Sequence, residues 1–140
     1  RRLMNIKLIE LDLAFEFASS GANFGNEAYL NLETGEFIYL GDIVDDEQPE
    51  DLCDSKKYLC IPTKHDFNLG RNLAIQFAEE ILPKEIDSVY SIFRSRGAFG
   101  RFKRFLSERN ALDKWHEYEE RAQKEALLSW CEENGITCDA

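Results

Sequence analysis

The spacing of the hydrophobic residues changes at Pro62, and this change constrains the fold more than any other feature of the chain. Before Pro62, short runs of aromatic and β-branched residues alternate with turn residues, which is typical of strands. After residue 63 the apolar residues recur at helical spacing as far as residue 134. Because strands and helices are segregated along the chain, the sequence predicts an α+β fold.

A helix is expected before the strands, over residues 6–18. Alternate apolar residues in this run would suit a strand, whereas Ile6, Ile9 and Leu13 recur at helical spacing. The length of the run and its content of Leu, Ala and Glu favour the helix.

A small antiparallel sheet of three strands is predicted next. Residues 28–40 have the pattern of a hairpin, and Gly35 supplies the positive φ that its turn requires. Residues 58–62 are the expected third strand, which ends at Pro62 because proline cannot continue the hydrogen-bond ladder.

The first helix after the strands is predicted to begin at a capping box. Thr63 is followed three positions later by Asp66, and the apolar stripe then continues to Pro83. Gly70 would lie inside this helix at a cost of about 1 kcal/mol relative to Ala. This cost suggests that another backbone approaches closely at Gly70.

Three further helices complete a predicted C-terminal bundle of about four. A stripe over residues 86–93 marks the second helix, with Gly97 placed to cap it, and Asn110 closes the third in the left-handed conformation. The last runs from about residue 111 to 134 and ends in a Schellman motif at Gly135. Its predicted inner face consists of Leu112, Trp115, Ala122, Ala126, Ser129 and Trp130.

The chain has 140 residues, of which 44% are hydrophobic, and this is enough for one buried core. We expect a single domain over residues 4–140, with Met4 as the native start and residues 1–3 as an added remnant. The sequence shows no signal peptide and no apolar run of the ~20 residues that a membrane span needs. The expected location is therefore the cytoplasm.

Acidic residues accumulate between the second and third predicted strands, and the formal net charge of the chain is −10. Mutual repulsion of these carboxylates favours a solvated loop over residues 42–57. Residues 42–46 lack the alternating ligands and central glycine of a calcium loop, so no metal site is predicted there.

The cysteines and histidines match no known catalytic or metal-binding motif. Each cysteine pair encloses six residues, which fits no zinc template, and we expect reduced thiols with Cys131 in the core. His116 and Glu120 at i, i+4 could ligate a metal ion, but two ligands do not define a site. We predict no metal and no cofactor. The residues concerned are Cys53, Cys60, Cys131, Cys138, His65 and His116.

Residues 94–104 reverse the charge of the chain, because they contain five cations and no acid. On a helix that starts near Ala98, the aromatic residues Phe99, Phe102 and Phe105 fall on the core side and the cations on the other. The cations are Arg94, Arg96, Arg101, Lys103 and Arg104.

Two interpretations of these cations remain open. In the structural one, Arg94 and Arg96 compensate the dipole at a helix end, and Arg104 pairs with Glu108 one turn later. In the functional one, glycines, a helix N-terminus and flanking guanidinium groups form a site for phosphate or carboxylate.

Three segments of the chain resemble the bacterial uncharacterised protein family (UPF) 0158. They are residues 28–37, 58–77 and 92–136, and their most specific parts are Gly97–Lys103, Trp115–Ala126 and Trp130–Ile136. The resemblance covers nearly the whole chain from Met4. It implies a compact bacterial domain with no established activity, and it supplies no catalytic motif.

The function expected from the sequence is that of a non-enzymatic cytoplasmic binding or adaptor domain. Its partner would be anionic, either an acidic protein segment or the phosphate of a nucleotide or RNA, and residues 94–104 would form the contact. One alternative is a small hydrolase that uses His65 or His116 with nearby carboxylates. Another is a purely structural role, in which the cations pack against the acidic loop.

Overall fold

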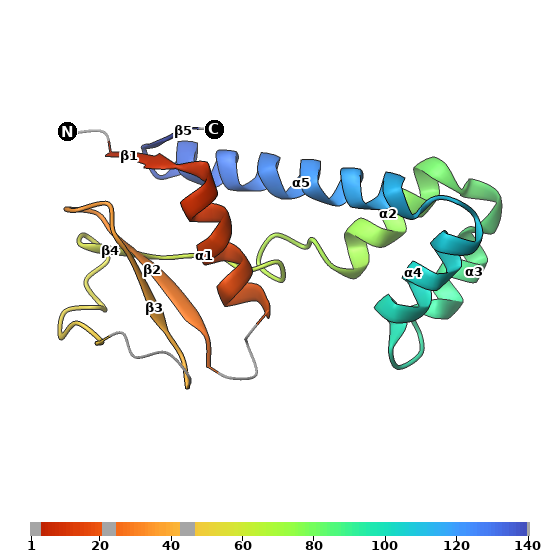
Figure 1. Cartoon of the computed structure of the whole chain (residues 1–140), viewed down its shortest axis with the longest axis horizontal. Coiled ribbons are helices and arrows are strands. Elements are labelled where there is room, and N and C mark those ends of the chain that lie inside the picture. The colour runs from red at the N-terminus through yellow and green to blue at the C-terminus, as the bar shows by residue number, and fades with distance from the viewer. Residues whose placement is uncertain (1–3, 21–24, 43–46, 140) are drawn as a thin grey trace. The chain divides into compact units, whose positions relative to one another are not determined.

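The structure, a computed structural model, describes residues 4–20, 25–42 and 47–139 (Figure 1). The chain divides into two compact units. We call residues 1–67 with 126–140 the sheet unit, and residues 68–125 the helical unit. The predicted added residues 1–3, and residues 43–46 of the predicted acidic loop, lie outside the described residues.

The predicted three-stranded antiparallel sheet is confirmed, with β2 in the centre of the order β3-β2-β4 (Figure 1). In the turn after β2, the side-chain oxygen of Asn31 accepts hydrogen bonds from the N–H groups of Glu33 and Thr34, at 2.8 and 3.2 Å. Gly35 has a φ of +79°, the left-handed conformation predicted for it. The strands are β2 (Glu27–Asn31), β3 (Phe37–Leu40) and β4 (Tyr58–Cys60).

A second sheet of two strands was not predicted. β1 (Met4–Lys7) pairs in parallel with β5 (Ile136–Asp139), so that Ile6 lies opposite Cys138. Each strand has four residues and buries one isoleucine, Ile6 or Ile136. Such short segments carry too little periodicity to be recognised, and nothing local indicates a partner at the other end of the chain.

The predicted N-terminal helix is confirmed as α1 (Leu8–Ser20), although Ile6 lies in β1 instead. Helical spacing did not identify its buried face, because Ile9 and Leu13 are 68% and 60% exposed. The buried face is the one that packs against β2. It consists of Leu11, Ala14, Phe15 and Ala18.

The helix predicted from Thr63 begins later, as α2 (Arg71–Ile81). The capping-box contacts do form: the Thr63 N–H donates to Asp66 Oδ2 at 2.9 Å, and the Asp66 N–H donates to Thr63 Oγ1 at 3.3 Å. The turn does not propagate, because Asn68 adopts a left-handed φ of +56°. The capping box therefore closes a separate turn.

Gly70 is the N-cap of α2 and not an interior helical residue, so that part of the prediction is wrong. A Cβ atom at Gly70 would have its nearest neighbour at 4.0 Å, the ring of Phe99. This is an ordinary van der Waals distance to a side chain. The expected close approach of another backbone is therefore not found.

The helical unit is built around a cluster of aromatic rings. The ring of Trp115 lies 5.4 Å from that of Phe77 and 5.2 Å from that of Phe102, and the three side chains are almost fully buried. These contacts fix α4 against α2 and the first half of α5. The elements after α2 are η2 (Pro83–Glu85), α3 (Ile86–Ile92), α4 (Ala98–Glu108) and α5 (Leu112–Glu133).

The ends of α4 and α5 follow the predicted pattern of left-handed residues. Asn110 has a φ of +55°, and the N–H of Ala111 donates to the carbonyl oxygen of Leu106 at 2.8 Å, as in a Schellman motif. Gly135, the second residue after α5, has a φ of +68°. Within α5, however, Ser129 of the predicted inner face is exposed.

Candidate functional site

We call residues 94–104 the basic segment. It begins just after α3 and includes the first seven residues of α4, Ala98 to Arg104. Gly97 has a φ of +66° and is the N-cap of α4, so it begins that helix and does not cap α3 as predicted. The hydroxyl of Ser95 donates to the carbonyl oxygen of Ile92 at 2.8 Å. The left-handed glycine and this hydrogen bond turn the chain from one helix into the next.

The aromatic side of α4 holds the basic segment on the core. Phe102 and Leu106 are buried, and the ring of Phe102 lies 5.3 Å from the ring of Phe93. All five cations of the basic segment are exposed, which agrees with the amphipathic pattern of the sequence. Phe99 departs from it, because 39% of its surface is exposed although the pattern assigns it to the core side.

The five cations form no ion pair within the helical unit, all of whose residues the structure describes. The predicted pair of Arg104 with Glu108 is absent there. Glu108 instead lies 4.0 Å from Arg109, whose Nε donates to Glu85 at 2.7 Å. The carboxylates of Glu85 and Glu108, near the end of α4, are therefore both paired with Arg109.

Arg101 lies over the turn that carries Arg94 and Arg96. Its Nη1 donates to the Ser95 hydroxyl at 3.3 Å, so its guanidinium keeps most of its donors for another acceptor. The basic segment is thus a set of exposed cations, arranged around one helix start, whose charges are not neutralised within their unit.

Charge is distributed unequally between the two units. The sheet unit contains six Lys and Arg against seventeen Asp and Glu, a net charge of −11, whereas the helical unit contains eleven against ten, a net charge of +1. The overall charge of −10 therefore belongs to the sheet unit. The basic segment, with a local charge of +5, lies in the unit that is otherwise nearly neutral.

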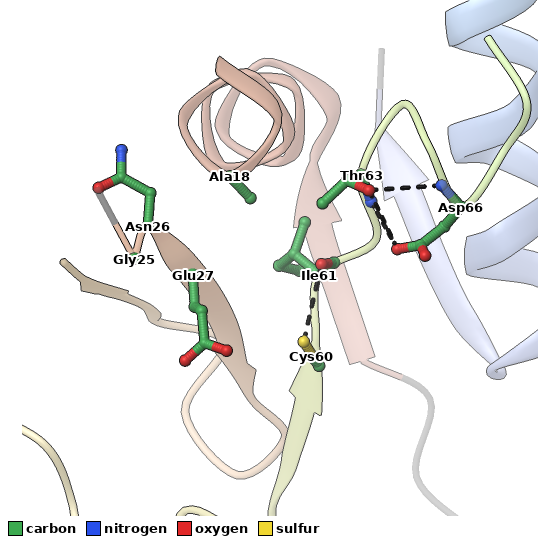
Figure 2. Close-up of a pocket in the computed structure, with 8 residues that line it drawn as sticks. All are labelled: Ala18, Gly25, Asn26, Glu27, Cys60, Ile61, Thr63 and Asp66. Atoms are coloured by element: carbon green, nitrogen blue, oxygen red, sulfur yellow. Dashed lines mark hydrogen bonds between the residues drawn. The ribbon is translucent and has the colours of Figure 1, made fainter. Parts of the chain in front are cut away.

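The sheet unit contains a hollow of about 480 Å³ (Figure 2). Ala18 and Ile61 line it with apolar surface, and the carboxylates of Glu27 and Asp66 lie around it. Its lining consists of Ala18, Gly25, Asn26, Glu27, Cys60, Ile61, Thr63 and Asp66.

The hollow does not favour nucleophilic catalysis by its thiol. Cys60 is exposed as a residue, but partial burial of its thiol, followed in size by the negative charge of Glu27, raises the pKa of Cys60 above its usual range. Burial also raises the pKa of the neighbouring Tyr29 hydroxyl to about 12. Both groups therefore stay protonated at neutral pH, and a protonated thiol is a poor nucleophile.

The two histidines are both exposed, His65 in the sheet unit and His116 in the helical unit. Neither makes a hydrogen bond or ion pair with another described residue. Among the described residues, no three His, Cys, Asp or Glu side chains are grouped so as to hold a metal ion. Neither histidine is thus paired with a carboxylate among the described residues, although the hydrolase alternative relies on such a pair.

Cys131 is buried as predicted, and its thiol lies beside that of Cys138. Burial raises the pKa of Cys131 to about 12. Cys53 and Cys60 are exposed, and all four thiols are free.

The chain belongs to the Uncharacterised protein family (UPF0158), whose family model matches residues 3–140. The resemblance seen in the sequence is therefore confirmed. No curated protein and no solved structure matches the chain. In the part of the chain that the structure describes, no helix is long and apolar enough to cross a membrane.

Proposed function

We propose that this chain is a cytoplasmic, non-enzymatic binding domain that contacts an anionic partner through the basic segment. The observation that supports the proposal is that Arg94, Arg96, Arg101, Lys103 and Arg104 are all exposed and form no ion pair within the helical unit. Five unneutralised cations in eleven residues repel one another. An anion placed among them removes that repulsion.

Helix stability explains only part of this cluster. Arg94 and Arg96 lie beyond the end of α3, whose last turn contains no basic residue, so the predicted compensation of the helix dipole, which acts mainly within the last turn, accounts for little of their charge. Arg101 lies at the end of the first turn of α4, where the dipole disfavours a cation, and that turn contains no acid. Interaction with the helix dipole therefore does not explain why α4 carries these cations.

The position of the cations suits an extended anion better than a duplex. Surface charges act over a Debye length of about 8 Å at physiological salt, so the basic segment can attract an anion despite the net charge of the chain. A duplex would bring many more phosphates toward a protein whose net charge is −10. We therefore expect an acidic protein segment or a single strand as the partner.

The test is a salt titration of binding to two labelled probes, a short oligouridylate RNA and a short oligoglutamate peptide of equal charge. The affinity for at least one probe should fall steeply with salt, and the double variant Arg101→Glu with Arg104→Glu should lose at least tenfold. Lys114→Glu with Lys124→Glu is the matched control, because it changes the net charge equally through exposed residues of α5. It should leave the affinity within about twofold.

Two results would contradict the proposal. One is a flat response to salt, and the other is equal loss in the two double variants, which would mean that only net charge matters. A purely structural role predicts instead that Arg101→Glu with Arg104→Glu lowers the free energy of unfolding while neither probe binds. Urea unfolding of the same variants distinguishes that role.

A further inference from the structure

We propose that the anionic partner is a single-stranded nucleic acid, and that Phe99 stacks on one of its bases. This inference rests on the proposed function and narrows its partner. Three features of the helical unit support it: an exposed ring, an unexplained glycine, and cations beside both.

Phe99 is exposed where the sequence pattern assigns it to the core side. The other rings of α4, Phe102 and Phe105, are buried and half-buried, whereas 39% of Phe99 is exposed. Its ring stands edge to face with the ring of Phe93, with centroids 5.1 Å apart. The contact holds Phe99 in place, so binding a base there costs little side-chain entropy.

Gly100 has no structural reason to be a glycine. It lies in the first turn of α4, where glycine is less favourable than alanine, and its φ is not among the positive ones. A Cβ atom built on Gly100 would meet nothing within 4 Å. Neither packing nor backbone conformation requires glycine here, whereas the close approach of a ligand backbone would.

The ring and the glycine each have a cation one helical turn away. Lys103 follows Phe99 by four residues and Arg104 follows Gly100 by four, so each pair shares a face of α4. Both cations are exposed and form no ion pair within the helical unit. When a base stacks on Phe99, Lys103 and Arg104 would thus lie next to the open surface at Gly100 and could bind the neighbouring phosphates.

This combination distinguishes a nucleic acid from an acidic peptide. Carboxylates would need only the cations, and they would leave the exposed ring and the open glycine without a role. Binding sites for single strands combine a basic surface with aromatic side chains on which bases stack. Bases in a duplex are already stacked, so a duplex could not use Phe99.

The test compares a single-stranded oligonucleotide with its abasic counterpart, which keeps the phosphates and lacks the bases. The full-length chain should bind the base-bearing strand about 5- to 10-fold more tightly, since stacking on one ring contributes about 5- to 150-fold per base. Phe99→Leu should remove this preference and leave the affinity for the abasic strand unchanged. Ile81→Ala is the matched control, because Ile81 is an equally exposed apolar residue of the same unit, and it should keep the preference.

Gly100→Ala gives an independent test, because it should raise the stability of the protein and lower its affinity for the single strand. Helix propensity predicts a higher melting temperature, while the added methyl group should weaken binding of the single strand severalfold.

RNA and DNA strands of one sequence are compared to identify which sugar is preferred.

The outcomes separate this inference from the proposed function. Equal affinity for base-bearing and abasic strands, with loss in Arg101→Glu and Arg104→Glu, would overturn the stacking role and keep an anionic partner. Tighter salt-sensitive binding of oligoglutamate than of any strand would identify an acidic protein segment instead. Absence of binding to every probe would overturn both proposals.

Discussion

The cations of the sheet unit and those of the basic segment differ in their surroundings. Lys57 lies 3.0 Å from Asp51, and Lys64 lies 3.9 Å from Glu16, all within a unit of net charge −11. Within the helical unit, no cation of the basic segment has such a partner. Lys57 and Lys64 thus lie beside carboxylates of their own unit, whereas residues 94–104 concentrate charge without a carboxylate partner inside the helical unit.

The same contrast appears between Arg104, within α4, and Arg109, the residue that caps its C-terminal end. Arg109 pairs with Glu85 and lies 3.6 Å above the ring of Phe105, whereas Arg104, five residues earlier, is exposed and unpaired within the unit. The difference shows that the lack of an ion-pair partner within the helical unit is not common to every arginine at α4, since Arg109 is also exposed and is paired. It depends on which carboxylates the fold brings near.

The largest expected effect is on the core that supports the basic segment. Phe102→Ala should lower the free energy of unfolding by about 3 to 5 kcal/mol, because it leaves a cavity against Trp115 and Phe93. Urea unfolding measures the loss, and Ile9→Ala, at a largely exposed position, should change it by less than about 0.5 kcal/mol. A small loss for Phe102→Ala would mean that the basic segment is not fixed by that ring.

A smaller effect should separate Arg104, within α4, from Arg109 at its C-terminal cap. Arg109→Ala should cost about 1 kcal/mol, because it removes a half-exposed ion pair and a cation–π contact. Arg104→Ala should change the free energy of unfolding by no more than about 0.5 kcal/mol. If both variants lower the free energy of unfolding by the same amount, Arg104 has a structural partner, and the contrast between a paired Arg109 and an unpaired Arg104 is invalid.

The smallest effect concerns pH and the acidic hollow. Because burial and the charge of Glu27 raise the pKa of Cys60 above the usual 9.0, the rate of its alkylation should reach half-maximum above pH 9.0. Because folding raises this pKa, the protonated thiol of Cys60 favours the folded state. This contribution to stability is fully present below the pKa that Cys60 has in the unfolded chain, and it is lost as the pH rises through the pKa of Cys60 in the folded chain.

Glu27→Gln tests the cause, since it removes one of the negative charges near the thiol. The half-maximum of the Cys60 alkylation rate should shift to lower pH, as followed by mass spectrometry. Asp54→Gln, a charge change elsewhere in the sheet unit, is the control. An unchanged or higher midpoint in Glu27→Gln would show that Glu27 does not act on Cys60.

Local patterns predicted the elements that depend on neighbouring residues. The hairpin around Gly35 and the left-handed end of α4 at Asn110 follow from turn and cap chemistry within a few positions. Some local predictions failed as well, because the left-handed Asn68 delays the start of α2, but two of the errors arise where the partner is distant in sequence. β1 and β5 define each other, and the buried face of α1 is set by its contact with β2.

The same division applies to the candidate site. Helical periodicity placed Arg101, Lys103 and Arg104 on the solvent side of α4 correctly. It also predicted an ion pair between Arg104 and Glu108, which the competing contacts of Arg109 replace within that unit. The exposure of Phe99 and the open space around Gly100 have no signal in the spacing of apolar residues.

By itself, the sequence determined the first helix, the three-stranded sheet and the helices that follow it, the excess of acid, and the cluster of cations at residues 94–104, because propensity, periodicity and charge are local properties. The tertiary structure alone decided which cations are neutralised and left Phe99 exposed against the helical pattern. The reason is that folding brings together atoms of residues far apart along the chain, as it does for Arg109 with Glu85 and for Lys64 with Glu16.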